Sequence, residues 1–209
     1  EALEGALPLH QNTPLKCNYN LYAEQLSGTS FTTPRALNRK TWSYRIMPSA
    51  NHEPYQLLEH YNNYVISDFD HDTRVSINPN RLRWDPFPLI SNKSIDKQEN
   101  FIQGMRTICG SGNTSQKHGL AIHIYTFEKD MSINEAFVNS DGDYLIVPQQ
   151  GILHITTEYG ILIVEPWEFC VIPRGIKFSI KNYDPSISSM CRGYICEIYT
   201  HAHFELPEL

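Results

Sequence analysis

The chain has 209 residues, of which 41% are hydrophobic and 19% charged, a balance typical of a folded globular protein with one sizeable core. Its formal net charge of −6 argues against a nucleic-acid partner, because such a partner requires a basic patch. No apolar run approaches the ~18 residues needed to cross a bilayer, and residues 1–10 lack the basic and apolar regions of a secretory signal.

The five cysteines, Cys17, Cys109, Cys170, Cys191 and Cys196, form no CxxC pair. An odd number at wide spacing is typical neither of a disulfide framework nor of a paired-cysteine zinc site. We therefore expect free thiols in a reducing compartment, and a cytoplasmic protein.

Residues 1–100 show no regular hydrophobic period. They contain 8 of the 13 prolines, together with many asparagines and serines. Thr41–Met47 has the composition of a short strand, and Tyr55–Tyr64 that of one or two helical turns. Because a long irregular stretch is uncommon inside a compact domain, we predict that residues 1–100 form an irregular N-terminal arm that packs on the β domain or on a neighbour.

From about residue 118 the sequence changes to short β-branched and aromatic runs separated by turn residues. Asn139–Gly142 has turn chemistry, and Gly142 is expected to supply a positive φ there. Strands at this spacing predict a sandwich or barrel rather than βαβ units, so we expect residues 101–209 to form an all-β domain with little helix. The expected strands are Leu120–Phe127, Tyr144–Pro148, Ile152–Thr157, Ile161–Val164, Phe169–Ile172, Phe178–Ile180 and Gly193–Tyr199.

Two spaced elements within this domain follow a known pattern in part. Gly151 ends the first element, Pro173–Gly175 lies at the centre of the second, and Asn182 ends it. Trp167 stands where the second element would begin with glycine. The spacing resembles that of cupins, G-x5-H-x-H-x3–4-E-x6-G followed by G-x5-P-x-G-x2-H-x3-N, and so predicts a degenerate cupin-like jelly-roll barrel.

The metal-ligand positions of that pattern carry unsuitable side chains. Alternate residues of a strand share one face, so histidines at i and i+2 would converge inside such a barrel. In chain order these positions hold Phe137 and Asn139 (or Val138 and Ser140 at the shorter spacing), Tyr144 and Phe178. Because these side chains cannot replace imidazoles and a carboxylate around Fe(II) or Zn(II), we predict no metal, cofactor-binding or catalytic residue in this chain.

A second histidine pair lies near the end of the chain. His201 and His203 have the spacing of metal ligands, and Glu205 and Glu208 follow them. Pro207 would interrupt any strand that continued through them. A surface pair or a partly packed pair is therefore the expected interpretation.

Four other polar groups have structural interpretations. His123 alternates with isoleucines and is expected to be a hydrogen-bonded structural residue rather than a ligand. Cys109, beside glycines, is expected in a turn, since no partner base marks it as a nucleophile. Asp141 and Asp143 flank a glycine and are expected in a solvated turn, and Arg81–Trp84 is interpreted as a packing motif rather than a cation–π site.

Several longer segments of the sequence carry a more specific resemblance. They are, in chain order, Asn20–Ala36, Thr41–Ala50, Asn80–Pro88, Gly119–Thr126, Asn139–Ile152, Glu168–Lys181 and His203–Leu209. Together they span nearly the whole chain and resemble the N-terminal half of homogentisate 1,2-dioxygenases. Members of that family usually begin with a GFGNEF-like stretch, which this sequence does not contain.

The resemblance implies a protein of about twice this length that opens the ring of homogentisate with O2 at a non-haem Fe(II), giving maleylacetoacetate in tyrosine and phenylalanine breakdown. In that family two histidines and a glutamate of the C-terminal half hold the iron, so no ligand transfers to a residue of this chain. The resemblance also implies homo-oligomers, as trimers that pair into hexamers, with no membrane or nucleic-acid partner.

Two functions stay open on this basis. The first is a non-catalytic domain of a dioxygenase that serves assembly and scaffolding. Its residues 17–50 would contact the C-terminal half or a neighbouring subunit, or equally would cover the barrel's own open face. The alternative is a free-standing cupin binding module or a sugar-isomerase-like enzyme that acts through the barrel interior. The unsuitable side chains at the ligand positions favour the first function, as do the segments outside the barrel that resemble the dioxygenase family.

Overall fold

The computed structural model describes residues 19, 21–25, 42–48, 51, 53–54, 64–75, 83 and 98–205. The chain divides into two compact units, Glu1–Leu57 and Leu58–Leu209. The regular structure of the described residues is entirely β-strand, and no helix among them is long and apolar enough to cross a membrane. The expected all-β class is confirmed.

The first unit contains a two-stranded antiparallel sheet. Strand β1 (Tyr22–Gln25) pairs with β2 (Trp42–Arg45), with Tyr22 opposite Arg45. The Arg45 guanidinium binds the Glu24 carboxylate at 3.0 Å. The strand expected within Thr41–Met47 is therefore confirmed. The helical turns expected over Tyr55–Tyr64 fall on residues outside the described part, except for Tyr64.

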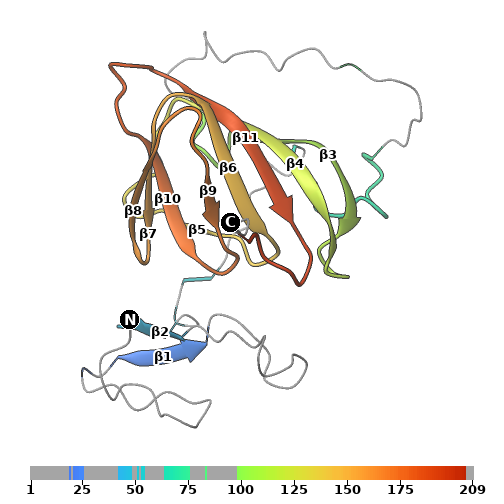
Figure 1. The fold of residues 1–209 in the computed structure, drawn as a ribbon, viewed down its shortest axis with the longest axis horizontal. Helices are drawn as coiled ribbons and strands as arrows, with labels where there is room; N and C mark the ends of the chain where they lie inside the picture. The colour runs from blue at the N-terminus through green and yellow to red at the C-terminus, as the bar shows by residue number, and fades with distance from the viewer. Residues whose placement is uncertain are drawn as a thin grey trace. The chain divides into compact units, whose positions relative to one another are not determined.

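The described residues of the second unit form nine strands in two antiparallel sheets (Figure 1). They are β3 (Met105–Asn113), β4 (His118–Phe127), β5 (Phe137–Val138), β6 (Asp143–Gln150), β7 (Leu153–Thr157), β8 (Gly160–Val164), β9 (Cys170–Ile172), β10 (Lys177–Asn182) and β11 (Cys191–Ile198). All seven strands expected from the sequence are present, with ends that differ by one or two residues.

The strand order is that of a jelly roll. One sheet has the order β3-β4-β11-β6-β9 and the other the order β5-β10-β7-β8. From β4 to β11 the chain passes back and forth between the sheets, so that β4-β11-β6-β9 faces β5-β10-β7-β8 as in an eight-stranded jelly roll of two Greek keys. Strand β3 extends the first sheet. The expected jelly-roll architecture is confirmed by this order alone.

The hydrophobic core lies between the two sheets. Alternate residues of each strand point inward, as in Lys177–Asn182, where Phe178 and Ile180 are buried and their neighbours are partly exposed. Several aromatic rings fill the centre. The largest fully buried hydrophobic side chains are Phe101, Tyr125, Phe127, Phe178, Tyr199, Ile146, Leu153, Ile155, Ile180 and Ile195.

Two sequence-based expectations about local structure are wrong. Cys109 lies within strand β3 rather than in a turn, and its glycine neighbour Gly110 leaves room for another element, because a Cβ there would meet the Phe69 ring at 2.2 Å. Gly142 does not have a positive φ. Its Cβ would lie 2.7 Å from Cγ of Glu197, so the position requires glycine for space rather than for backbone conformation.

A segment from the proline-rich region accompanies strand β3. The Thr107 N–H donates to the Tyr64 carbonyl at 2.8 Å, and the Phe69 N–H donates to the Gly112 carbonyl at 2.9 Å. The Arg106 guanidinium lies over the Tyr64 ring, 4.2 Å from its centroid. These contacts explain why the boundary between the two compact units lies after Leu57 and not near residue 100, where the composition of the sequence changes.

Candidate functional site

Three of the four side chains at the ligand positions of the cupin pattern meet inside the barrel. Phe137 comes from β5, Tyr144 from β6 and Phe178 from β10. The Phe137 ring stacks on Tyr144 with centroids 6.4 Å apart, and Phe178 meets the two rings edge-on at 5.7 and 6.5 Å. The spacing therefore identified positions that do share one interior site, and aromatic rings occupy it.

This aromatic cluster offers one oxygen atom, the hydroxyl of Tyr144, which is nearly fully buried. The hydroxyl lies 4.0 Å from Sδ of Met105 as a weak donor. Burial, followed by the nearby Glu197 carboxylate, raises the pKa of Tyr144 well above its ordinary value. The phenol therefore stays protonated near neutral pH, and its oxygen is the single one that the aromatic cluster offers.

The other candidate positions are engaged elsewhere or lie apart. The Asn139 amide donates to Oε1 of Glu197 at 2.5 Å, while its oxygen accepts the N–H groups of Asp141 and Gly142 at 2.9 and 3.3 Å. These bonds confirm the turn expected after Asn139. At the shorter spacing, Val138 lies opposite Lys177 and Ser140 is exposed, so neither points into a common interior site.

Behind the aromatic cluster lies a buried polar network centred on His123 and Glu197. Nε2 of His123 lies 2.9 Å from Oε2 of Glu197, and Nδ1 lies 3.0 Å from the hydroxyl oxygen of Thr107. The Tyr199 hydroxyl donates to the same carboxylate at 3.2 Å. Because both ring nitrogens are engaged, His123 has no nitrogen free for a metal, and the expected hydrogen-bonded histidine is confirmed.

Glu197 is the residue of this network that the sequence reasoning missed. It follows Ile195 at the spacing of one strand face, and Ile195 is fully buried. A carboxylate at such an inward position requires partners, because an unpaired buried charge is very unfavourable. That alternation was the available signal, and the partners come from β4, from the turn after β5 and from Tyr199, which follows β11.

A second buried carboxylate anchors the end of the described chain. Asp143, fully buried, accepts hydrogen bonds from the backbone N–H and Nε of Arg174 at 2.9 and 2.8 Å. Nδ1 of His203 lies 2.7 Å from its other oxygen. Burial alone would raise the pKa of Asp143, but the bonds to Arg174 and His203 outweigh it and hold the pKa below its ordinary value. The expected solvated turn is wrong for Asp143 and right for Asp141, which is exposed.

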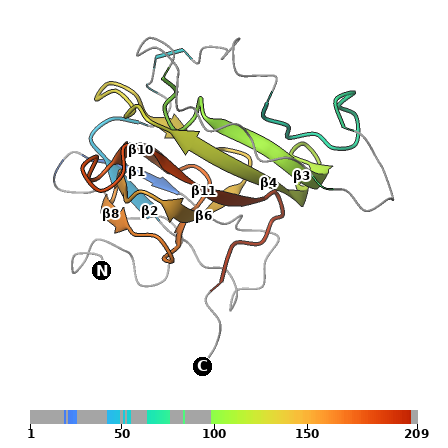
Figure 2. The same cartoon turned by 90° about the horizontal axis from the view of Figure 1, so that it is seen from above.

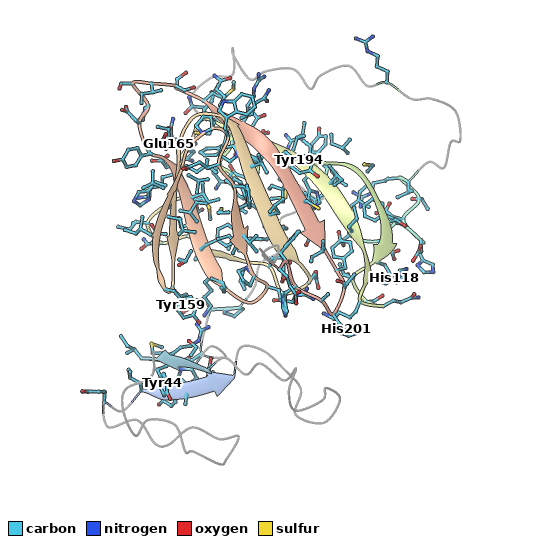
Figure 3. All side chains as sticks on the ribbon, in the orientation of Figure 1. Tyr44, His118, Tyr159, Glu165, Tyr194 and His201 are labelled. Atoms are coloured by element: carbon cyan, nitrogen blue, oxygen red, sulfur yellow. The ribbon has the colours of Figure 1, made fainter. Side chains whose placement is uncertain are left out.

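The histidine pair near the end of the chain does not converge on one point. His203 binds Asp143, whereas His201 is exposed (Figure 3). Glu205 is also exposed, and Glu208 lies outside the described residues. A partly packed pair is therefore what the structure shows.

Among the described residues one group of three side chains has metal-ligand spacing: Asp68, Asp70 and His71. Oδ1 of Asp68 accepts the N–H groups of Asp70 and His71, each at 3.0 Å, so the group is a hydrogen-bonded turn. It was not singled out from the sequence, and exposed turns of this kind are common without an ion. Most of the Arg81–Trp84 motif lies outside the described residues, and Arg83 is exposed.

A family model described as Homogentisate 1,2-dioxygenase N-terminal matches residues 1–209 of the chain. The chain belongs to this family. Proteins named homogentisate 1,2-dioxygenase from Drosophila melanogaster and Arabidopsis thaliana are 49% and 48% identical over the full chain, and that from Homo sapiens is 47% identical over 98% of it. The chain spans 43–45% of the length of these relatives, so it corresponds to the N-terminal half of a homogentisate 1,2-dioxygenase.

Solved structures similar to the chain are more distant. A cupin-2 domain containing protein from Shewanella frigidimarina is 18% identical with a TM-score of 0.34, covering 45% of this chain and 78% of its own. The Schizosaccharomyces pombe Cnp3 cupin domain is 15% identical with a TM-score of 0.36, covering 52% and 69%.

The interior of this homogentisate 1,2-dioxygenase domain does not fit an iron ion. Fe(II) in a facial triad requires two imidazoles and a carboxylate with open positions beside them. The site instead presents two phenyl rings and a protonated phenol, and the adjacent His123 and Glu197 bind each other. Among the described residues, no cysteine belongs to a group with metal-ligand spacing.

Proposed function

We propose that this chain is a non-catalytic domain of homogentisate 1,2-dioxygenase that serves assembly and supports the half that carries the chemistry. The observation that carries the proposal is the aromatic cluster at the ligand positions, in a chain that matches the N-terminal family model from end to end. The same cluster disfavours a binding module or an isomerase acting through the barrel interior, because aromatic rings fill the place where a ligand would lie.

In the complete protein we propose the conversion of homogentisate and O2 to maleylacetoacetate at Fe(II). The iron ligands would come from the region that the relatives have beyond the part matched by this chain. Homogentisate and O2 are therefore partners of the complete enzyme, and this domain binds neither on its own.

Two further properties belong to the same proposal. We expect homo-oligomers, with residues 17–50 contacting either the remaining half of the chain or a neighbouring subunit. We expect a cytoplasmic location, in line with the free state of the four described cysteines, Cys109, Cys170, Cys191 and Cys196.

The test compares the 209-residue chain with the complete protein. After circular dichroism has verified β-structure in both, bound iron and O2 consumption with homogentisate are measured side by side. The complete protein is expected to bind iron and consume O2, and the 209-residue chain to do neither. Stoichiometric iron or turnover in the short chain would refute the non-catalytic role.

A further inference from the structure

The outward face of the five-stranded sheet is apolar over the middle of β4, β11 and β6. In β4, Ala121, His123 and Tyr125 point into the core, so the residues between them point outward. The same alternation applies to β6 and β11. The outward positions hold Leu120, Ile122 and Ile124 of β4, Leu145 and Val147 of β6, Val171 of β9, and Tyr194, Cys196 and Ile198 of β11.

The strand register places these residues side by side in continuous rows. Ile122 is opposite Cys196, which is opposite Leu145, which in turn is opposite Val171. A parallel row runs through Ile124, Tyr194 and Val147. No charged side chain interrupts either row across these strands, so the rows form one apolar surface, which we call the outer apolar face.

The outer apolar face retains solvent exposure. Leu120 is 40% exposed and Tyr194, labelled on β11 in Figure 3, is 37% exposed. An antiparallel sheet with one face in water normally alternates apolar and polar residues, whereas near-continuous apolar strands are typical of a sheet covered on both sides. A contiguous exposed apolar surface of this kind marks an interaction site.

The end of the described chain lies beside this face. Asp143 is two residues before Leu145 in β6, so it lies on the outward side of the sheet. Arg174 and His203 bind it, and Nη2 of Arg174 also donates to the Ala202 carbonyl at 3.0 Å. These bonds hold residues 202–203 at the border of the outer apolar face, where the chain leaves strand β11 (Figure 2).

We propose that the outer apolar face is the surface on which the remaining half of the complete enzyme packs. This inference rests on the proposed function. More than half of each relative's length lies outside the part that the chain matches, which is enough for a covering layer. A segment tethered at residues 202–203 reaches the face at high effective concentration. A second copy would instead need this surface to be self-complementary about a two-fold axis.

The test places a photo-crosslinker, p-benzoylphenylalanine, at Tyr194 in the complete enzyme, with the same group at Thr156 as the matched control. Thr156 is exposed on the outward side of β7, in the four-stranded sheet. The expected product is an intrachain crosslink between a peptide containing residue 194 and a peptide beyond residue 209. Its yield should exceed any such product from position 156 several-fold.

Covalent dimers as the main product at Tyr194 would overturn the proposal in favour of a second copy. Equal yields at the two positions would overturn it too, because the face would then be uncovered. Homogentisate turnover of the unsubstituted complete enzyme is assayed separately. Turnover without the crosslink refutes only the docking surface, whereas the crosslink without turnover refutes only the proposed activity.

Discussion

The two sheets of the barrel have similar inner faces and different outer faces. The outward residues of β7 and β10 in the four-stranded sheet are polar: His154, Thr156, Lys177, Ser179 and Lys181. The outward residues in the middle of β4, β6 and β11 are apolar. The edge strands β8 and β5 bring apolar residues to the outward side of the smaller sheet: Ile161 and Ile163 at 60% and 41% exposure, and Val138 opposite Lys177. The order of polar and apolar residues along a strand therefore indicates what covers each of its two faces, and not only that the segment is a strand.

The difference is already visible in the amino-acid sequence. Lys177–Asn182 alternates polar and apolar residues without exception up to its last position, as expected for a sheet with one wet face. Tyr144–Pro148 is continuously apolar. Both sheets contribute to one core, so the extra apolar residues of the larger sheet have no role inside the barrel.

The largest expected effect separates the two sides of β10. Phe178→Ala removes a fully buried ring that contacts Phe101, Phe137 and Tyr144, and should lower the free energy of unfolding by about 3–5 kcal/mol through lost burial and the cavity left behind. Lys181→Ala, outward on the same strand, should change it by no more than about 0.5 kcal/mol. Urea unfolding measures both. Equal losses would break the assignment of inner and outer faces.

On β11 the inner and outer faces are compared through an inward polar residue and its outward neighbour. Glu197→Ala leaves His123, Asn139 and Tyr199 without their shared acceptor, so the free energy of unfolding should fall by about 3 kcal/mol. The neighbouring Cys196→Ala, on the outer apolar face, is the control and should cost about 1 kcal/mol or less in the 209-residue chain. If Glu197→Ala were harmless, the network would not stabilise the sheet.

The outer apolar face can be tested by a polar substitution in the complete enzyme. Ile122→Ser should lower the unfolding free energy by about 2 kcal/mol there, because it removes apolar contact and buries a hydroxyl under the covering half. Thr156→Ala, on the polar outer face of the other sheet, should have an effect within about 0.5 kcal/mol. The difference in unfolding free energy between the two variants should be smaller in the 209-residue chain, where position 122 stays partly exposed. A persistent, equal loss in both proteins would argue that nothing covers the face.

The anchor at the border of this face should depend on pH. The pKa of Asp143 is held below its ordinary value, so its contribution to stability is fully present above that value and is lost as pH falls through the lowered pKa. Asp143→Asn should therefore destabilise the chain by about 1–2 kcal/mol at pH 7, and the gap should narrow in acid. Unfolding midpoints measured from pH 7 down to pH 3 test this. A gap independent of pH would mean that the carboxylate charge is not what holds Arg174 and His203.

The sequence predicted the architecture well and the polar interior poorly. Strand positions follow from local alternation and turn residues, which is why β4 and β6 to β11 were found. Strand β3 was missed because its glycines, Gly110 and Gly112, have low strand propensity, and its register is set by pairing with β4 and with residues 64–69. Most partners of Glu197 and Asp143 are distant from them in the sequence, and no local pattern specifies such pairs.

One residue that spacing did single out is Trp167, and it gives the smallest expected effect. It follows Pro166 in a turn closed by the Glu168 N–H donating to the Glu165 carbonyl at 3.1 Å, and has φ 78°, as at the third position of a type II turn. That conformation favours glycine, and the indole is 96% exposed, so no packing offsets the strain. Trp167→Gly should raise the free energy of unfolding by about 0.5–1 kcal/mol.

Trp167→Ala is the matched control, because it removes the same indole but keeps the Cβ that makes a positive φ unfavourable. Thermal unfolding of both variants distinguishes strain from the loss of the ring. Stabilisation by glycine alone identifies the backbone as the cause, since the two variants differ only in that Cβ. If alanine stabilised the chain as much as glycine does, the exposed indole itself would be the unfavourable group, and the turn at the end of β8 would be free of strain.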